Sequence, residues 1–408
     1  MRDLVVVGGG PAGLATATLA CRAGLTVTVV DRHPEPPVDK ACGEGLMPDG
    51  VEALERLGVA VADLGGAPFA GIRYVDGETV AEGRFPGRPG LGVRRTRLHA
   101  LLVERAAAAG AELRWGTAVT GLGRRGESAG TFRKSADPFG GKVAGTSETA
   151  RSTGDFFVVE TADGALPARW VVGADGLLSR LRGWAGLAGR PARQRRFGVR
   201  RHLRVAPGEV PDKVEVWWGD GCEAYVTPVA GDEIGVAVLW QDRAGEAANF
   251  DRLLARLPRL AGRLQGRPAA SRDRGAGPLA QRVRRAFAGN LALVGDAAGY
   301  VDAITGEGLS LAFQQAEALV ASLVAEGGAG DLERYEAARR RLARLPDTMT
   351  RLLLFVERHR ALRRRAIRAL AADPALFSRL LALHVRDLPL ASFGWSGAAR
   401  LAWRLAAA

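Results

Sequence analysis

The sequence predicts an α/β fold: a parallel sheet assembled from several chain segments, a mixed or antiparallel second sheet, and a helical C-terminus. Three observations support this prediction. A glycine-rich turn near the N-terminus lies between two apolar, β-branched runs, alternating apolar and polar residues fill the region 199–239, and the chain beyond Gly308 reads as helical and rich in arginine. With 408 residues, 47% of them hydrophobic, the chain can form two or three packed units.

The first unit begins with a strand, a helix and a strand. Residues 4–7 and 25–30 are apolar runs typical of buried strands, and the Ala- and Leu-rich stretch 11–24 predicts a helix between them. Such a βαβ unit joins parallel strands by a right-handed crossover. We expect a further helix at 97–109 and a strand at 111–119.

The middle of the chain changes character. Residues 121–154 are crowded with Gly, Ser, Thr, Arg and Lys and show no apolar period, which predicts a flexible insertion between two strands. Strand-like runs resume at 156–161 and 170–173, and another buried-strand run occupies 291–294. No internal repeat is visible.

The N-terminal glycine turn has the spacing G-x-G-x-x-G and follows a strand and opens a helix. Gly8 permits the tight turn, Gly10 lets the backbone approach a pyrophosphate, and Gly13 lets the helix pack on the strand. The helix N-terminus offers free N–H groups to phosphates. An acidic residue after the second strand accepts hydrogen bonds from a ribose. We therefore predict a Rossmann-like dinucleotide site formed by Gly8, Gly10, Pro11, Ala12, Gly13, Asp31 and Arg32.

Two later segments also follow strands. One is GADGLLSRLR at 173–182, and the other is LVGDAAG at 293–299. Together with the N-terminal turn, in this order and spacing, they resemble the group A flavin monooxygenase and geranylgeranyl-reductase superfamily. The resemblance covers nearly the whole chain apart from the insertion and the last helices. It implies FAD as the cofactor and is much less specific for the reaction.

The resemblance also implies individual roles. Asp296 would hydrogen-bond the ribityl chain, and a helix beginning near residues 306–308 would direct its N-terminus at the flavin ring and favour negative charge there. Arg95 is a candidate contact to FAD phosphate or ribose, with a solvated arginine as the alternative. The implied cofactor residues are Cys42, Gly43, Arg95, Asp175, Gly295, Asp296, Gly306, Glu307, Gly308 and Leu309.

Candidate catalytic residues lie in two stretches. KACGEGLMP at 40–48 resembles the loop beside the flavin in geranylgeranyl-type reductases and some polyketide hydroxylases; Cys42 either faces the ring or is a small buried thiol. GCEAYVTPV at 221–229 occupies the place of a strand that faces flavin and substrate, with Tyr225 and Pro228 as candidates. This stretch lacks the aromatic pattern of prenyl-lipid reductases and the tryptophan-rich motif of flavin halogenases.

The resemblance favours the first of three functions and leaves the other two as alternatives. The first is NAD(P)H-driven hydroxylation of a phenolic or polyketide-type, lipid-tailed substrate by O₂ through a flavin C4a-hydroperoxide, with NAD(P)H bound transiently. The second is reduction of a C=C bond in a prenyl or quinone-type lipid, and the third is a flavin redox sensor without turnover. Gly299 and Ala303 replace the histidine and proline that the hydroxylases usually carry, which is a departure toward the reductase pattern.

Composition limits the partners. The net charge of +13 rests almost entirely on arginine, which indicates either attraction to an anionic surface or a compositional bias of the coding sequence. No nucleic-acid-binding signature and no metal-ligand spacing among the five histidines appears. Three cysteines without a CxxC, no signal peptide and no 18-residue apolar run predict a cytoplasmic protein. The basic C-terminal helices either touch a membrane peripherally or cover the two sheets.

These features give a domain prediction. The FAD-binding domain comprises residues 1–175 with 176–198 and 285–330, and contains the insertion 121–154. A substrate-domain sheet occupies 199–284, and a C-terminal helical region occupies 331–408.

Overall fold

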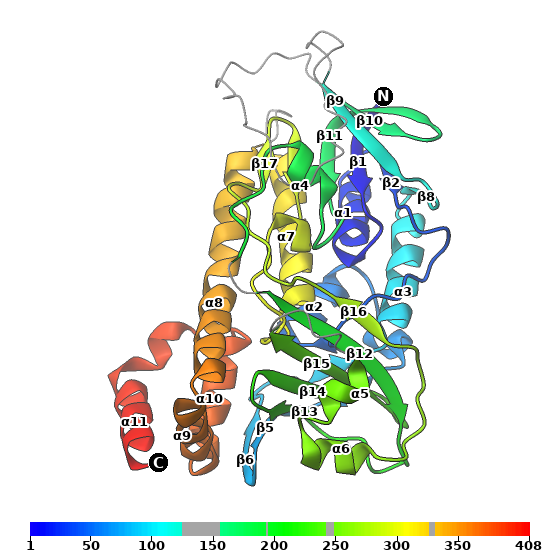
Figure 1. Ribbon diagram of the computed structural model, residues 1–408. Helices are drawn as coiled ribbons and strands as arrows, with labels where there is room; N and C mark the ends of the chain where they lie inside the picture. Colours follow the sequence, from blue (N-terminus) through cyan, green and yellow to red (C-terminus); the bar gives the residue numbers. More distant parts are fainter. Residues whose placement is uncertain (125–155, 193–194, 242–248, 326–330) are drawn as a thin grey trace.

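The computed structural model describes residues 1–124, 156–192, 195–241, 249–325 and 331–408. These residues form two large sheets, one small sheet and a set of helices at the C-terminal end of the chain (Figure 1). The mixed α/β class expected from the sequence is confirmed.

The cofactor-side sheet is parallel at its centre. Its order is β17-β18-β11-β1-β2-β8, and only the edge strand β17 in this series is antiparallel. The strands are β1 (Arg2–Val7), β2 (Val27–Val30), β8 (Glu112–Arg114), β11 (Gly164–Gly173), β17 (Phe287–Ala288) and β18 (Leu291–Leu293). Helix α1 (Pro11–Arg22) connects β1 to β2, so the predicted βαβ unit is present. The last four residues of β1 and all four residues of β2 are buried, as expected for parallel strands covered by helices.

Two expectations about this sheet were wrong. The single strand expected at 111–119 is interrupted, because Gly116 adopts a positive φ of 73° and turns the chain after the short β8. A separate strand, β9 (Val119–Arg124), then pairs with β10 (Phe157–Thr161), so the start of the expected insertion at residue 121 belongs to a strand. The rest of that insertion, from 125, lies outside the described residues.

The second large sheet has the order β16-β12-β15-β14-β13-β5-β6. Its strands are β5 (Gly71–Asp76), β6 (Thr79–Arg84), β12 (Arg196–Arg204), β13 (Val214–Trp218), β14 (Cys222–Ala230), β15 (Glu233–Gln241) and β16 (Arg274–Ala276). All neighbours are antiparallel except β13 and β5, which makes the sheet mixed. The β5–β6 hairpin comes from residues that the sequence analysis assigned to the FAD-binding domain.

The two faces of this second sheet pack on different partners. One face forms a core with α5 (Phe250–Leu254) and α6 (Pro258–Leu264). The other face packs against α8 (Leu332–Arg358), α9 (Arg360–Ala371) and α10 (Pro374–His384). A substrate chamber therefore has room to form between the sheet and the C-terminal helices.

The remaining elements complete the two layers. A small sheet joins β3 (Gly45–Leu46), β7 (Gly90–Gly92) and β4 (Ala67–Phe69). The other helices are α2 (Pro48–Arg56), α3 (Arg95–Ala108), α4 (Arg180–Trp184), α7 (Gly308–Leu323) and α11 (Gly394–Ala407), with short 3₁₀ turns at Val61–Leu64, Gly295–Ala298 and Leu390–Ser392. None of the helices in the described residues is both long enough and apolar enough to cross a membrane.

Candidate active site and cofactor pocket

One cavity of about 1050 Å³ runs between the two large sheets and the C-terminal helices. Residues from the glycine turn, the 39–47 loop, the 174–178 segment and the 294–309 segment line one end, which we call the cofactor end. The other end, which we call the apolar end, lies between the second sheet and α8–α11. Of the predicted site residues, the cavity lining includes Gly10, Pro11, Ala12, Arg32, Cys42, Gly43, Arg95, Asp175, Tyr225, Gly295, Asp296, Gly306, Gly308 and Leu309.

The glycine turn has the geometry that a diphosphate needs. A Cβ on Gly13 would lie 1.9 Å from the Gly8 carbonyl oxygen, so this position requires glycine for packing. A Cβ on Gly10 would instead meet only an Arg95 Nη2 atom at 4.0 Å and would project into open space. The Nε atom of buried Arg95 has no hydrogen-bond partner in the part of the chain that the structure describes. The N-terminus of α1, which no side chain caps, opens at the same place. These features fit the pyrophosphate of FAD.

Two buried polar side chains hold the glycine turn in place. The Asp31 carboxylate accepts hydrogen bonds from the Gly9 N–H at 2.7 Å and the His33 N–H at 2.8 Å. His99 Nε2 lies 2.7 Å from the Gly9 carbonyl oxygen, and burial lowers the pKa of His99 to about 4. A neutral His99 that donates its Nε2–H to the Gly9 carbonyl oxygen explains both the short distance and the lowered pKa. Asp31 is outside the cavity lining, so its predicted ribose contact stays a prediction.

Basic side chains surround Asp296 at the cofactor end. Burial raises the pKa of Asp296, while the charges of Arg95, Lys40 and Arg182 act in the opposite direction. Arg182 is buried and donates to the carbonyl oxygens of Asp296 and Ala297 at 3.3 and 3.2 Å. Arg182 therefore fixes the turn that carries Asp296, a role that the sequence analysis did not assign although the residue lies in the motif at 173–182.

A second helix N-terminus faces the cavity. Helix α7 begins at Gly308, no side chain caps it, and Gly306, Gly308 and Leu309 line the cavity beside it. Glu307 is the N-cap residue and lies outside the lining. Its buried Oε2 atom lies 3.6 Å from His384 Nε2 and has no hydrogen-bond partner among the described residues. Gly299 has a φ of 109°, a conformation that L side chains rarely adopt, so glycine suits this position of the turn.

The loop that carries Cys42 is clamped to the second sheet. Glu44 adopts a φ of 60°, unusual for a residue with a side chain, and its carboxylate accepts from the Arg95 N–H at 2.7 Å and contacts His202 on β12. Arg200, also on β12, pairs with Asp39 and donates to the Lys40 carbonyl oxygen at 3.2 Å. These contacts hold the loop rigidly, which favours precise placement of the thiol.

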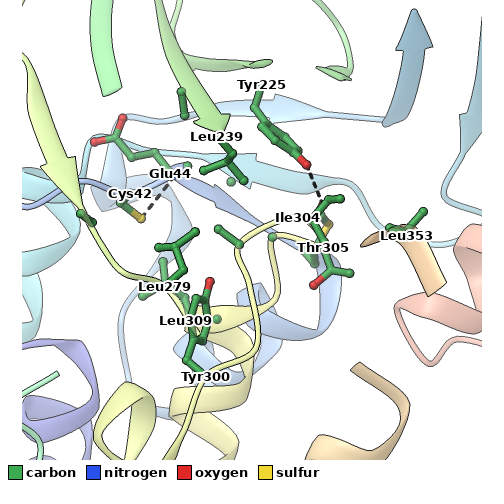
Figure 2. A pocket seen from close by; sticks show the side chains of 18 of the residues that line it. Cys42, Glu44, Tyr225, Leu239, Leu279, Tyr300, Ile304, Thr305, Leu309 and Leu353 are labelled. Carbon is green, nitrogen blue, oxygen red and sulfur yellow. Dashed lines mark hydrogen bonds between the residues drawn. The ribbon is translucent and has the colours of Figure 1, made fainter. Parts of the chain in front are cut away.

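Cys42 faces the cavity, and burial raises the pKa of its thiol (Figure 2). The Glu44 N–H donates to Cys42 Sγ at 3.4 Å. The thiol is therefore protonated at neutral pH. It lines the cavity, and its orientation toward the flavin ring stays a prediction.

Tyr225 lies across the cavity from Cys42 and donates its hydroxyl to the Ile304 carbonyl oxygen at 2.9 Å (Figure 2). Burial raises its pKa well above the usual value. Thr227 also lines the cavity, whereas Pro228 is buried outside the lining. Side chains alternate along a strand, so residues 225 and 227 share the cavity face and residue 228 points away. Pro228 therefore lies outside the cavity lining, and its catalytic role stays a prediction.

Three carboxylates converge on one buried arginine behind Tyr225. Arg196 Nε donates to Asp302 Oδ2 at 2.9 Å, and the same guanidinium contacts Glu223 and lies 3.7 Å from Glu357. Burial raises the pKa of Glu223 to about 8. The cluster ties the flavin-side loop 302–304 to the second sheet and to α8.

The apolar end is lined from several distant parts of the chain. Sheet residues that reach it are Ile72, Tyr74, Val214, Val216, Trp218, Ala237 and Leu239. Helix residues are Met349, Leu352, Leu353, Phe355, Val356, Leu362, Ala366, Ile367, Leu370, Phe377, Leu380, Leu381, Leu401 and Leu405, together with Arg363 and His384. This lining could not be predicted from the sequence, because its residues belong to many separate elements with no common motif. Such a lining suits a long apolar group rather than a polar one.

The sequence matches the family described as FAD binding domain over residues 1–346. The menaquinone reductase of Mycolicibacterium smegmatis is 59% identical over 58 residues, which is 14% of each chain, so the match spans about a seventh of that relative. The digeranylgeranylglycerophospholipid reductase 1 of Methanothermobacter thermautotrophicus is 25% identical over 320 residues, 75% of this chain and 73% of the relative. The rifampicin monooxygenase of Streptomyces venezuelae is 28% identical over 376 residues, 84% of this chain and 69% of the relative.

Solved structures share the fold. A flavoprotein/dehydrogenase from Cytophaga hutchinsonii superposes with a TM-score of 0.74 at 17% identity and covers 94% of this chain and 92% of its own. The anhydrotetracycline hydroxylase OxyS from Streptomyces rimosus has a TM-score of 0.67 at 25% identity and covers 94% and 76%. The family match, the helix termini and the open glycine turn agree with one another, and the chain belongs to the FAD-binding domain family of flavin-dependent oxidoreductases.

Proposed function

We propose that this protein saturates a C=C bond in the chain of a prenyl or quinone-type lipid. The observation that carries the proposal is the cavity, which continues from Cys42 at the cofactor end into a wall of aliphatic and aromatic side chains under α8–α11. An isoprenoid chain matches this wall, because burying apolar surface contributes about 25 cal/mol per Å² and requires no polar partner.

The relatives favour the same chemistry. Two groups of them are named as reductases of lipids, a menaquinone and a digeranylgeranylglycerophospholipid. The local identity with the menaquinone reductase of Mycolicibacterium smegmatis, 59%, is far above the 25% and 28% identity of the two long alignments.

The side chains of the cavity have separate roles in the proposed reaction. The apolar wall holds the lipid chain and excludes water, and the clamp on the 39–44 loop sets the position of Cys42. FAD held at the cofactor end would, when reduced, supply the hydride for one carbon of the double bond. The Cys42 thiol then gives its proton to the neighbouring carbon, which completes the C–H bond, and the thiolate takes a proton from solvent. A thiol that burial keeps protonated suits this role as general acid.

NAD(P)H is the proposed reductant. The glycine turn, the 173–182 segment and the 293–299 segment all serve the FAD site, so the nicotinamide cofactor binds transiently.

The test is product analysis with the purified holoenzyme. Photoreduced protein is mixed in D₂O, without oxygen, with a menaquinone that carries an unsaturated side chain, and the product mass is measured. We expect one saturated bond that carries two deuterium atoms, because the flavin N5–H and the Cys42 S–H both exchange with D₂O. Cys42→Ala should lose this product, whereas Cys21→Ala, a change of the same size on α1, should not. Unchanged saturation in Cys42→Ala would remove Cys42 from the mechanism.

Hydroxylation is the second candidate, and the long alignment with rifampicin monooxygenase favours it. Here the substrate is the phenolic or polyketide-type compound of the sequence analysis, with O₂ as co-substrate. Incubation of the same holoenzyme with NAD(P)H, air and an alkyl-substituted phenol distinguishes hydroxylation from reduction. A product heavier by one oxygen atom supports hydroxylation, and untouched phenol with saturated menaquinone supports reduction.

A further inference from the structure

The outer face of α11 is apolar and uncovered. Trp395 is 93% exposed and Trp403 is 61% exposed. With the exposed Ala399, Ala402 and Ala406 they recur at spacings of three and four residues and form one stripe along the helix. A surface helix that faces water normally shows polar residues on this side. Figure 1 shows α11 at the outer edge of the molecule beside α9 and the lower part of α8.

The same surface contains the opening of the apolar end of the cavity. Leu352 and Phe355 on α8 line the cavity and are nevertheless 53% and 52% exposed, so they form its rim. Leu401 and Leu405 line the cavity from the inner side of α11. Helix α11 therefore lies beside the apolar end of the cavity, with its inner side in the lining and its apolar stripe on the outer side.

Cationic side chains border this rim. Residues 351–408 contain eleven arginines and three side-chain carboxylates. Two of those carboxylates are buried: Asp373 pairs with Arg400 and Arg404, and Glu357 belongs to the Arg196 cluster. Arg358, Arg364 and Arg368 are exposed and form no ion pair with a described residue.

From this combination we infer that α11, with the rims of α8 and α9, docks on an anionic lipid bilayer and receives the lipid substrate directly from it. Tryptophan side chains prefer the interface between headgroups and acyl chains. Arginines beside an amphipathic helix are attracted by anionic headgroups. A second copy of this chain is a poorer occupant of the surface, because two arginine-rich rims would repel each other across a symmetric interface.

The inference deepens the proposed function, since it rests on a lipid substrate, and its experiment uses binding as the readout. FAD-loaded protein is mixed with vesicles of phosphatidylcholine alone or of phosphatidylcholine and phosphatidylglycerol in equal parts, and bound protein is measured by flotation. We expect binding to the anionic vesicles that weakens with added salt, and little binding to phosphatidylcholine alone.

Two double variants test the surface. Trp395→Ser with Trp403→Ser, and Arg364→Glu with Arg368→Glu, should each lower the partition coefficient by about tenfold or more. Arg190→Glu with Arg272→Glu reverses two exposed arginines outside the C-terminal helices and makes the same change in net charge as the arginine pair on α9. That control should bind like the unaltered protein. An equal loss of vesicle binding in the control would show that the arginine substitutions act only through net charge, and this would overturn the assigned surface.

Other outcomes are also decisive. Absence of vesicle binding, or a concentration-dependent dimer that both tryptophan substitutions abolish, overturns the inference. Saturation of a short prenyl alcohol dissolved in water should be unchanged in all three variants, because none of the altered residues lines the cavity. If the unaltered protein binds vesicles but reduces no prenyl substrate, the docking surface stands and the proposed reaction fails.

Discussion

The cofactor end and the apolar end of the cavity differ in chemistry and in how the chain builds them. The cofactor end consists of backbone N–H groups, two helix N-termini and basic side chains such as Arg95, supplied by short segments that mostly follow strands. The apolar end consists of single side chains from sheet strands and from four helices. Phosphate binding thus depends on local backbone geometry, whereas the apolar wall depends on how distant elements pack.

The largest expected effect separates ligand binding from folding at the cofactor end. Gly10→Val places a branched side chain in the open space beside Arg95, so we expect FAD affinity to fall by about 100-fold or more, equivalent to roughly 2.7 kcal/mol. The apoprotein should keep its thermal unfolding midpoint, because an added Cβ meets no protein atom closer than 4.0 Å. The FAD dissociation constant and the apoprotein midpoint are the two measurements.

Gly13→Ala provides the contrast. Its Cβ would collide with the Gly8 carbonyl oxygen, so folding and FAD binding should fail together. Full FAD occupancy in Gly10→Val would show that the pyrophosphate lies elsewhere.

This contrast also explains how far the sequence could predict the structure. Gly8, Gly13 and the strand–turn–helix around them follow from steric rules that act within a few residues, and the structure shows that geometry. The pairing of β5 with β13 joins residues about 140 positions apart, and no local sequence pattern predicts it. The Glu44–His202 contact likewise links a loop to a distant strand. The position of Pro228 outside the cavity lining could not be predicted, because the sequence does not show which face of its strand meets the cavity.

An intermediate effect is expected when the apolar end is filled. Ala366 on α9 lines the cavity, so Ala366→Phe should shorten the space for a lipid chain. We expect kcat/KM for a long prenyl chain to fall by on the order of tenfold or more, with FAD affinity unchanged. Ala361→Phe makes the same change on the exposed side of that helix and should leave turnover intact. Equal turnover of long and short chains by Ala366→Phe would mean that the chain does not enter between α9 and the sheet.

The last effect concerns stability and the cluster that joins the two ends. Burial raises the pKa of Glu223 to about 8, above the value near 4.5 of an unfolded chain, so between these values the folded state holds a proton that the unfolded state releases. The free energy of unfolding should therefore fall as pH rises from about 5 to 8, by up to about 1.4 kcal/mol per pH unit from this group.

Glu223→Gln cannot titrate and should flatten that slope, which denaturant unfolding at a series of pH values measures. Glu209→Gln, at an exposed carboxylate paired with Arg267, should leave the slope unchanged, because a carboxylate with a lowered pKa is ionised in both states throughout this range. Parallel slopes for the unaltered protein and Glu223→Gln would mean that Glu223 is ionised in the folded protein. Arg196 would then neutralise the Glu223 carboxylate fully. The cluster would link the flavin-side loop, the second sheet and α8 through ionised side chains, and Glu223 would hold no extra proton in the folded state.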